Sequence, residues 1–438
     1  MLVPSFHTAE RGLAFRRLSR RVFFTEEHRL RRGFAILPDT QRFASFPSFA
    51  ADTLAFVPVP WLAALSGTTR SPTEGAAVVW ASETYRQLMA EWARVFPASG
   101  DALESNALAV ESSSRLAGSD ATLLTALASA RHAVNASQDT DERVRRTAMV
   151  VRLLVKMDSI ATARALADSA LRAWRSPSPY QAGFLAGLAG LTGRAARAAA
   201  LVGHAASDSE HIPYSLTNGK RPAVPPDVMS GALQLETYAA LGGPRDSIRT
   251  LFSRTWRLID TWVPTADRAD VRQALFRNSY GTGFDQIAPL SSWVPVPYAD
   301  LVARMRIAMA RKDTAETRRV SSRFQTVTSS LGPGTMGIDR LYQYARMLLV
   351  LGDTAAAIQQ LDIALGTLPR ARGMLLKTPP QAGSIVPSML LRAELAWRAR
   401  DVTTFKRWAR PAVILWSDAD AELKRPIDQL RDRITSPP

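Results

Sequence analysis

The sequence has no cysteine and only five histidines, and each shortage removes a class of site. Without cysteine there is no disulfide, no thiolate nucleophile and no zinc site with a Cys ligand. The histidines are scattered, and none has a second histidine four residues further on. A phosphate-binding loop, a dinucleotide fingerprint and a G-x-S-x-G nucleophile motif are missing as well. We therefore expect no enzyme activity, no metal and no cofactor.

Long apolar runs are also missing. The most apolar stretch, residues 53–67, is interrupted by Pro58 and Pro60, so it is too short and too kinked to span a bilayer. The first residues, MLVPSFHTAERGLAFRRLSRR, have no apolar core after their charges, which argues against a secretory signal. We expect a soluble, cytoplasmic protein, or an extracytoplasmic one if the chain is a fragment of a membrane-anchored parent.

Strand-forming runs are scarce, whereas apolar residues recur at three- and four-residue spacing along most of the chain. This periodicity predicts an all-α protein. At 438 residues the chain is too long for one compact domain, but stacked units would give it one continuous core. The stretch 179–207 is unusually rich in Ala and Gly, which predicts helices packed with their backbones close together.

The formal net charge is +16, and only six of the 55 basic residues are lysines. Such a charge suits nucleic acid or an anionic membrane surface. The arginines are spread over many helices, however, and arginine with heavy alanine use is typical of a GC-rich bacterial genome. We favour a generally solvated basic surface. The best place for contact with phosphates is the basic N-terminal segment, residues 11–42.

Composition divides the chain into an unusual N-terminal part and a long helical part. Residues 1–72 are basic, aromatic and punctuated by proline, and they are predicted to be irregular. Helical repeats are predicted over 73–207 and 227–434. Proline, glycine and asparagine predict a loop at 208–226 and another near 281–297.

One turn recurs along the helical part. An Asp, commonly followed by Ser or Thr, begins a predicted helix at six places: Asp120, Asp158, Asp246, Asp313, Asp353 and Asp401. The side chain of such a residue accepts hydrogen bonds from free amides of the helix it precedes, which contributes about 1 kcal/mol. A unit of about 35 to 40 residues with insertions explains the series, and stacking lets such units bury their apolar faces.

The segment IDRLYQYARMLLVLGDTAAAIQQLDIALGTLP, residues 338–369, resembles a tetratricopeptide repeat. Small residues stand at Ala345, Ala357 and Ala364, a large one at Leu361, and Pro369 closes the unit. The other copies match less well. We expect an α-solenoid of divergent tetratricopeptide-like helical hairpins.

The last part, RDVTTFKRWARPAVILWSDADAELKRPIDQLRDRI, resembles the end of the helical-repeat region that follows the kinase domain in certain bacterial Ser/Thr protein kinases. Kinase motifs are missing: there is no glycine-rich loop with a following strand Lys, no H-R-D and no D-F-G. What the resemblance implies is a protein-binding scaffold or sensing region in signalling.

We expect a noncatalytic module that binds a peptide or protein, an acidic one being favoured, in a groove lined by the first helices of the repeats. Repeat geometry places five residues toward that groove: Arg152, Arg306, Tyr342, Arg346 and Trp397. Arginines there favour an acidic or C-terminal carboxylate ligand. Two alternatives stay open: a helical-toroid hydrolase using two carboxylates, for which WSDADAE is the candidate segment, and a scaffold docking through the basic N-terminus to nucleic acid or an anionic membrane.

Overall fold

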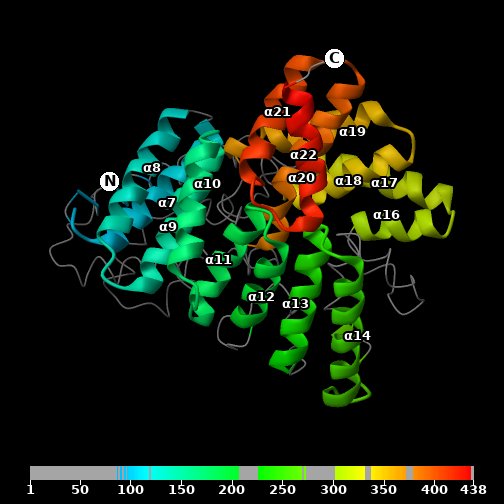
Figure 1. The fold of residues 1–438 in the computed structure, drawn as a ribbon, viewed down its shortest axis with the longest axis horizontal. Coiled ribbons are helices and arrows are strands. Elements are labelled where there is room, and N and C mark those ends of the chain that lie inside the picture. Colours follow the sequence, from blue (N-terminus) through cyan, green and yellow to red (C-terminus); the bar gives the residue numbers. More distant parts are fainter. Residues whose placement is uncertain are drawn as a thin grey trace, which may run out of the picture. The chain divides into compact units, whose positions relative to one another are not determined.

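The structure of the chain is a computed structural model that describes residues 86, 89–90, 93–94, 96–117, 120–206, 225–268, 271–272, 301–330, 337–370 and 378–435. Within these residues every regular element is a helix and no β-strand occurs, which confirms the all-α prediction (Figure 1). None of the helices that the structure describes is long and apolar enough to cross a membrane. The predicted segment 1–72 and the loop near 281–297 lie outside the described residues, as does nearly all of the loop 208–226.

The chain divides into two compact units, with the boundary between Met157 and Asp158. The described helices of the first unit are α7 (Gly100–Ala117), α8 (Asp120–Asn135) and α9 (Thr140–Lys156), and α8 packs on both others. This boundary was not predicted. The boundary separates the two helices that were predicted to pair at Asp158, because α9 lies before the boundary and the next helix lies after the boundary.

The second unit contains the remaining helices that the structure describes. They are α10 (Ile160–Ala173), α11 (Pro179–Leu191), α12 (Ala195–Ala205), α13 (Pro226–Leu241), α14 (Arg245–Trp262), α16 (Leu301–Ala310), α17 (Thr314–Ser330), α18 (Ile338–Val350), α19 (Thr354–Gly366), α20 (Pro379–Arg398), α21 (Val402–Leu415) and α22 (Ala421–Thr435). Consecutive helices pack as pairs: α11 on α12, α13 on α14, α16 on α17, α18 on α19, and α20 on α21.

A shared turn joins three of these pairs. Asp313, Asp353 and Asp401 each accept a hydrogen bond from the backbone N–H three residues later, at 2.9 to 3.0 Å. The residue before each Asp has a left-handed backbone, with φ of 58° at Lys312 and 83° at Gly352. Each turn also closes with an N–H from the Asp to the carbonyl five residues earlier. The predicted capping is therefore confirmed at these three positions.

The other three Asp positions differ. Asp158 itself has a left-handed backbone, with Ser159 as the residue before α10. Asp246 lies inside the first turn of α14, where its charge still suits the helix N-terminus. Asp120 is the first residue of α8, and its side chain is not among those that the structure describes.

Helices far apart in sequence also pack together in the second unit. α20 contacts α11, α13 and α18, and α21 contacts α10. Small residues permit the approach: a Cβ added to Gly190 of α11 would lie 3.2 Å from the carbonyl oxygen of Pro379 in α20. This confirms the backbone-close packing predicted for the Ala- and Gly-rich stretch. In a simple row of repeats each hairpin touches only its neighbours, so the packing of α20 on α11 departs from a single row.

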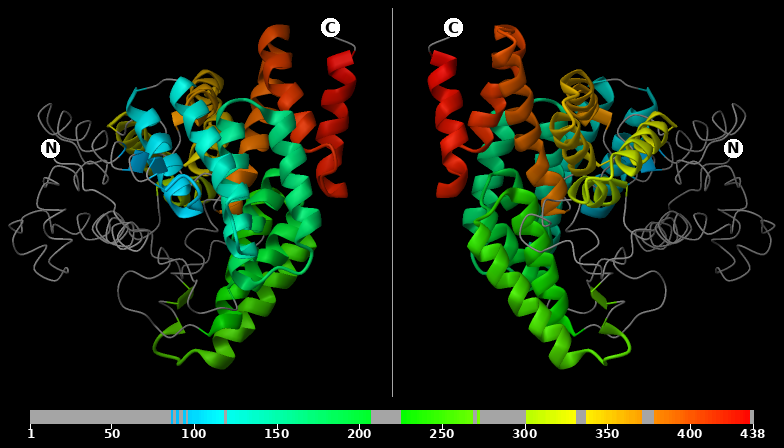
Figure 2. Two further views of the ribbon diagram at one scale, coloured as in Figure 1. Left: turned by 90° about the vertical axis from the view of Figure 1, so that its left-hand side faces the viewer. Right: turned by 90° about the vertical axis from the view of Figure 1, so that its right-hand side faces the viewer.

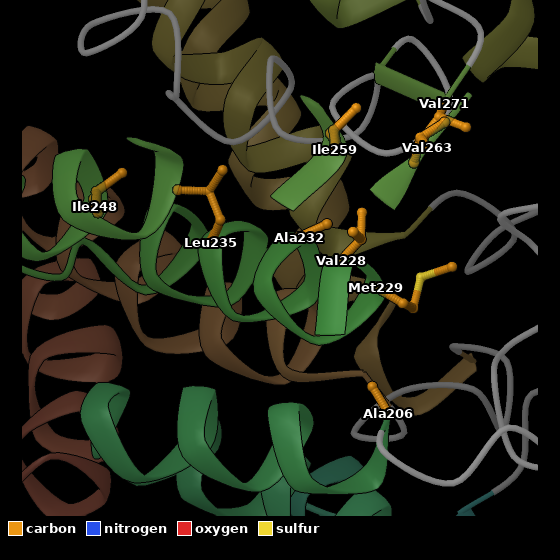
Figure 3. Packing of buried hydrophobic residues seen from close by; sticks show 9 residues of the cluster. All are labelled: Ala206, Val228, Met229, Ala232, Leu235, Ile248, Ile259, Val263 and Val271. Atoms are coloured by element: carbon orange, nitrogen blue, oxygen red, sulfur yellow. The ribbon is translucent and has the colours of Figure 1, made fainter. Parts of the chain in front are cut away.

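One apolar cluster holds α13 and α14 together (Figure 3). α13 contributes Val228, Ala232 and Leu235, and α14 contributes Ile248 and Ile259, all buried. These residues recur at the spacing of one helical face, which is why the pair forms from a local sequence. α21 and α22 pack together at the C-terminal end of the unit, where Figure 2 shows them in orange and red.

Candidate functional site

A cavity of about 420 Å³ lies within the second unit, between α13, α18, α20 and α22. This volume is in the range of pockets that hold small ligands or parts of larger ones. Much of the wall is apolar. Its apolar members include Ala239, Leu241, Leu390, Leu391, Leu423 and Leu430.

α18 contributes Tyr342 and Arg346, two of the five residues predicted to face a groove. They are one helical turn apart, so they share a face of α18, and both are partly exposed. The guanidinium carbon of Arg346 lies 5.8 Å from the centre of the Tyr342 ring. The opposite face of α18 is buried and anchors the helix: Tyr344, for example, stacks on Phe324 of α17. The rest of the protein thus fixes where this pair points.

Arg346 is the notable charge of this wall, because it has no ion pair with any residue that the structure describes. Its described interaction is the weak cation–π contact with Tyr342. Burial raises the pKa of Tyr342, and the nearby positive charge of Arg346 opposes that rise. The tyrosine is therefore neutral at physiological pH.

A second cation, Arg433 of α22, lines the same cavity but is paired. It contacts the carboxylate of Glu394 in α20, which also accepts a hydrogen bond of 2.9 Å from Arg398. Burial opposes the negative charge of Glu394, but hydrogen bonds from Arg433 and Arg398 outweigh it and lower the pKa of this carboxyl. Glu394 is the one carboxylate in the described wall. The cavity wall therefore carries two guanidinium groups and one carboxylate.

Trp416, at the end of α21, is a buried part of the wall. Its indole Nε1–H has no hydrogen-bond acceptor among the described residues. A Cβ added to Gly193, between α11 and α12, would lie 3.0 Å from the Cδ1 next to this nitrogen, so this edge of the ring packs against the turn between those helices.

Trp397 of α20, the third predicted residue in this region, is not part of the wall. Its ring packs on Phe405 of α21, with 4.9 Å between the ring centres. The guanidinium carbon of Arg433 lies 5.1 Å from its ring centre. Trp397 thus supports a cavity residue from behind.

Arg152 was predicted to face the groove, but the structure buries it in the first unit, with 5% of its surface exposed. Its Nε donates to Glu111 at 2.9 Å, and its second guanidinium nitrogen contacts the other carboxylate oxygen. Lys156 binds the same carboxylate at 2.7 Å. A paired and buried guanidinium of this kind serves the fold, so we leave Arg152 out of the site. The side chain of Arg306, the fifth predicted residue, is outside the description.

The acidic segment WSDADAE has structural partners. Asp418 pairs with Arg164 at 2.8 Å. Asp420 accepts a hydrogen bond of 2.9 Å from the backbone N–H of Ala196, in the first turn of α12. Asp420 therefore caps α12, a helix that is distant from it in sequence. No group of three or more His, Cys, Asp or Glu among the described residues is placed to hold a metal ion.

Sequence reasoning missed Glu394, Arg433 and the apolar wall from α13 and α22. Nothing local marks these residues, because the cavity forms only where helices more than a hundred residues apart come together. The proline inside α22, Pro426, also lines the cavity, but prolines occur in α20 and α21 too. Pro426 alone would therefore not have pointed to a site.

No protein-family model matches the sequence, and no curated protein shows a significant match to it. The cavity and the charges around it therefore carry the functional argument.

Proposed function

We propose that this chain is a noncatalytic binding protein, and that the cavity between α13, α18, α20 and α22 holds a short segment of a partner polypeptide. The observation that carries the proposal is Arg346, a partly exposed guanidinium without an ion pair at an otherwise largely apolar cavity. An accessible guanidinium can bind a carboxylate through two parallel hydrogen bonds, and ligand pockets are typically apolar with a few such polar groups.

The architecture supports the same proposal. Three helix pairs share the capped turn at Asp313, Asp353 and Asp401, and such units are typical of diverged tetratricopeptide-like repeats. We propose that the hairpins belong to this class of repeat, in a solenoid closed on itself by α20. Repeats of this class bind polypeptide segments between helices. The resemblance to the region that follows certain bacterial kinase domains points to the same scaffold or sensing role.

A two-carboxylate hydrolase is a weaker proposal for this cavity. Glycoside hydrolysis generally uses two carboxyl groups, one as acid and one as base or nucleophile. The described wall offers Glu394 alone, and that group is held ionised by two arginines. It lacks the raised pKa that a general acid needs at neutral pH.

Filling the cavity tests the proposal. Random heptapeptides are selected for binding to the wild-type protein, and the enriched peptides are measured against Ala239→Leu, which adds bulk at the wall. The matched control is Ala165→Leu, at an exposed position of α10. We expect Ala239→Leu to weaken binding at least about tenfold and the control to leave it unchanged. Failure to enrich any peptide, or equal binding by both variants, would contradict the proposed function.

A further inference from the structure

We infer that the exposed face of α17 binds the phosphate backbone of duplex nucleic acid without sequence preference. Five exposed cations make up this surface, the α17 face, two of them in the turn before the helix and three on the helix itself: Arg311, Lys312, Arg318, Arg319 and Arg323. None of them lines the cavity between α13, α18, α20 and α22. The α17 face is therefore a second binding surface, independent of the proposed function.

The three helical arginines of the α17 face point the same way. At 3.6 residues per turn, positions 318, 319 and 323 fall within an arc of about 140°. The other side of α17 is buried through Thr317, Val320 and Phe324. The ring of Phe324 stacks on that of Tyr344 in α18, with 4.1 Å between the ring centres. The fold thus holds the arginines on the side that faces water.

The charge of the α17 face is largely unopposed. Four of its five cations, all but Arg319, have no ion pair with any residue that the structure describes. Arg319 pairs with Glu316 at 2.9 Å, and Glu316 also holds Arg304 of α16 at 2.8 Å. The remaining carboxylate, that of Asp313, caps α17. Residues 311–330 carry five basic side chains and two acidic ones, so an anion is favoured there.

The other side chains of the α17 face decide which polyanion fits. Thr314 and Ser322 are exposed beside the cations, and such hydroxyl groups donate to phosphate oxygens together with arginine. The described residues of α17 expose no large apolar side chain that could enter a membrane. The aromatic residue of the helix, Phe324, is buried, so it offers no platform for the bases of a single strand.

A duplex supplies the matching charge without needing apolar contact. It carries one negative charge per 1.7 Å of its axis, so a helix of roughly 25 Å, the length of α17, has many phosphates within reach. Contacts with phosphates carry no information about base sequence. We therefore expect binding that depends strongly on salt and equally weakly on sequence.

Fluorescence anisotropy with labelled DNA tests the inference on the full chain. The probes are two duplexes of about 20 base pairs with unrelated sequences and one of their single strands, titrated from about 50 to about 300 mM salt. We expect the two duplexes to bind equally and more tightly than the single strand. The logarithm of the affinity should fall linearly with the logarithm of the salt concentration.

Matched double variants locate the binding surface. Arg318→Gln with Arg323→Gln should weaken duplex binding at least about tenfold at about 100 mM salt and reduce the salt slope by about 2, since each lost phosphate contact removes about 0.9. Lysine at the same two positions keeps the charge and should keep the slope. The control is Arg254→Gln with Arg257→Gln on α14, two exposed arginines without an ion pair to a described residue, and it should leave the slope unchanged.

Each contrary outcome overturns one part of the inference. Equal losses in the two glutamine variants would show that binding follows overall charge and not the α17 face. Tighter binding of the single strand, or a preference between the two duplexes, would overturn the duplex backbone as the ligand. Binding to phosphatidylserine vesicles that Arg318→Gln with Arg323→Gln abolishes, with duplex binding intact, would assign the face to a membrane instead.

The same assay separates the α17 face from the cavity. Ala239→Leu fills the cavity and should leave duplex binding unchanged. A loss of duplex binding in Ala239→Leu would contradict the independence of the two surfaces. Failure of the peptide selection alone leaves the α17 face standing, and failure of duplex binding alone leaves the cavity standing.

Discussion

Two arginines predicted to do the same thing have opposite surroundings in the two units. Arg152, in α9 of the first unit, is buried and holds the carboxylate of Glu111 with two nitrogens. Arg346, in α18 of the second unit, is partly exposed at a cavity and has no ion pair with a described residue. Both stand on helices whose other residues form a core. The two arginines differ in their ion-pair partners and not in their positions within a helix.

The difference shows how to tell a structural charge from an available one. Placing Arg152, Lys156 and Glu111 away from water is expensive, and only mutual pairing offsets that cost. Once paired, these groups have little to offer a ligand. Arg346 keeps contact with water, so it needs no ion pair to offset a cost of burial.

Glu111→Gln should strongly destabilise the first unit. The change leaves Arg152 buried without its carboxylate, and breaking a buried pair in this way costs about 3 to 5 kcal/mol. Hydrogen exchange with mass spectrometry over residues 144–155 measures the local free energy of opening. Asp428→Asn is the control, since its ion pair with Arg431 is exposed, and it should change stability by no more than about 0.5 kcal/mol. Equal effects would mean that the buried cluster is not structural.

Acid should weaken the first unit through the same carboxyl. Burial raises the pKa of Glu111, but Arg152 and Lys156 outweigh it and lower that pKa from 4.5 to about 2. The folded state thus binds the proton of the Glu111 carboxyl less tightly than the unfolded state does. The stabilisation that the ionised carboxyl contributes is therefore complete above pH 4.5. It is lost as the pH falls from about 4.5 to about 2, and it is on the order of 3 kcal/mol.

The measurement is the free energy of opening of α9 against pH in the wild type and in Glu111→Gln. The difference between the two proteins should shrink across this pH range, because glutamine does not titrate. Other carboxyl groups contribute to both curves and cancel in the difference. A difference that stays constant down to pH 2 would show that Glu111 is not held ionised by its neighbours.

The helices of the fold were predictable from sequence because their causes are local. The apolar spacing of α13 and α14 and the capping aspartates Asp353 and Asp401 act over a few residues, so reading along the chain finds them. The packing of α20 on α11 was not predictable in the same way. Gly190 signalled a close approach to some backbone, but not that Pro379 would be its partner.

The candidate site also divides into residues that a local pattern predicts and residues that only the tertiary fold brings together. Tyr342 and Arg346 were predicted from the position of α18 in a tetratricopeptide-like unit, and the structure places both at the cavity. The same reasoning placed Arg152 in a groove, because its partner Glu111 is about 40 residues away and pairing over that distance leaves no local pattern. Glu394 and Arg433 were missed for the same reason, since α22 meets α20 only through the tertiary fold.

The central claim is that Arg346 is available to a ligand whereas Arg152 holds the protein together. One paired measurement tests it most directly: the local free energy of opening of α9 in Arg152→Gln and of α18 in Arg346→Gln, each against the wild type. We expect a loss of about 3 kcal/mol or more for Arg152→Gln and a change of less than about 0.5 kcal/mol for Arg346→Gln. A loss for Arg346→Gln as large as that for Arg152→Gln would contradict the account.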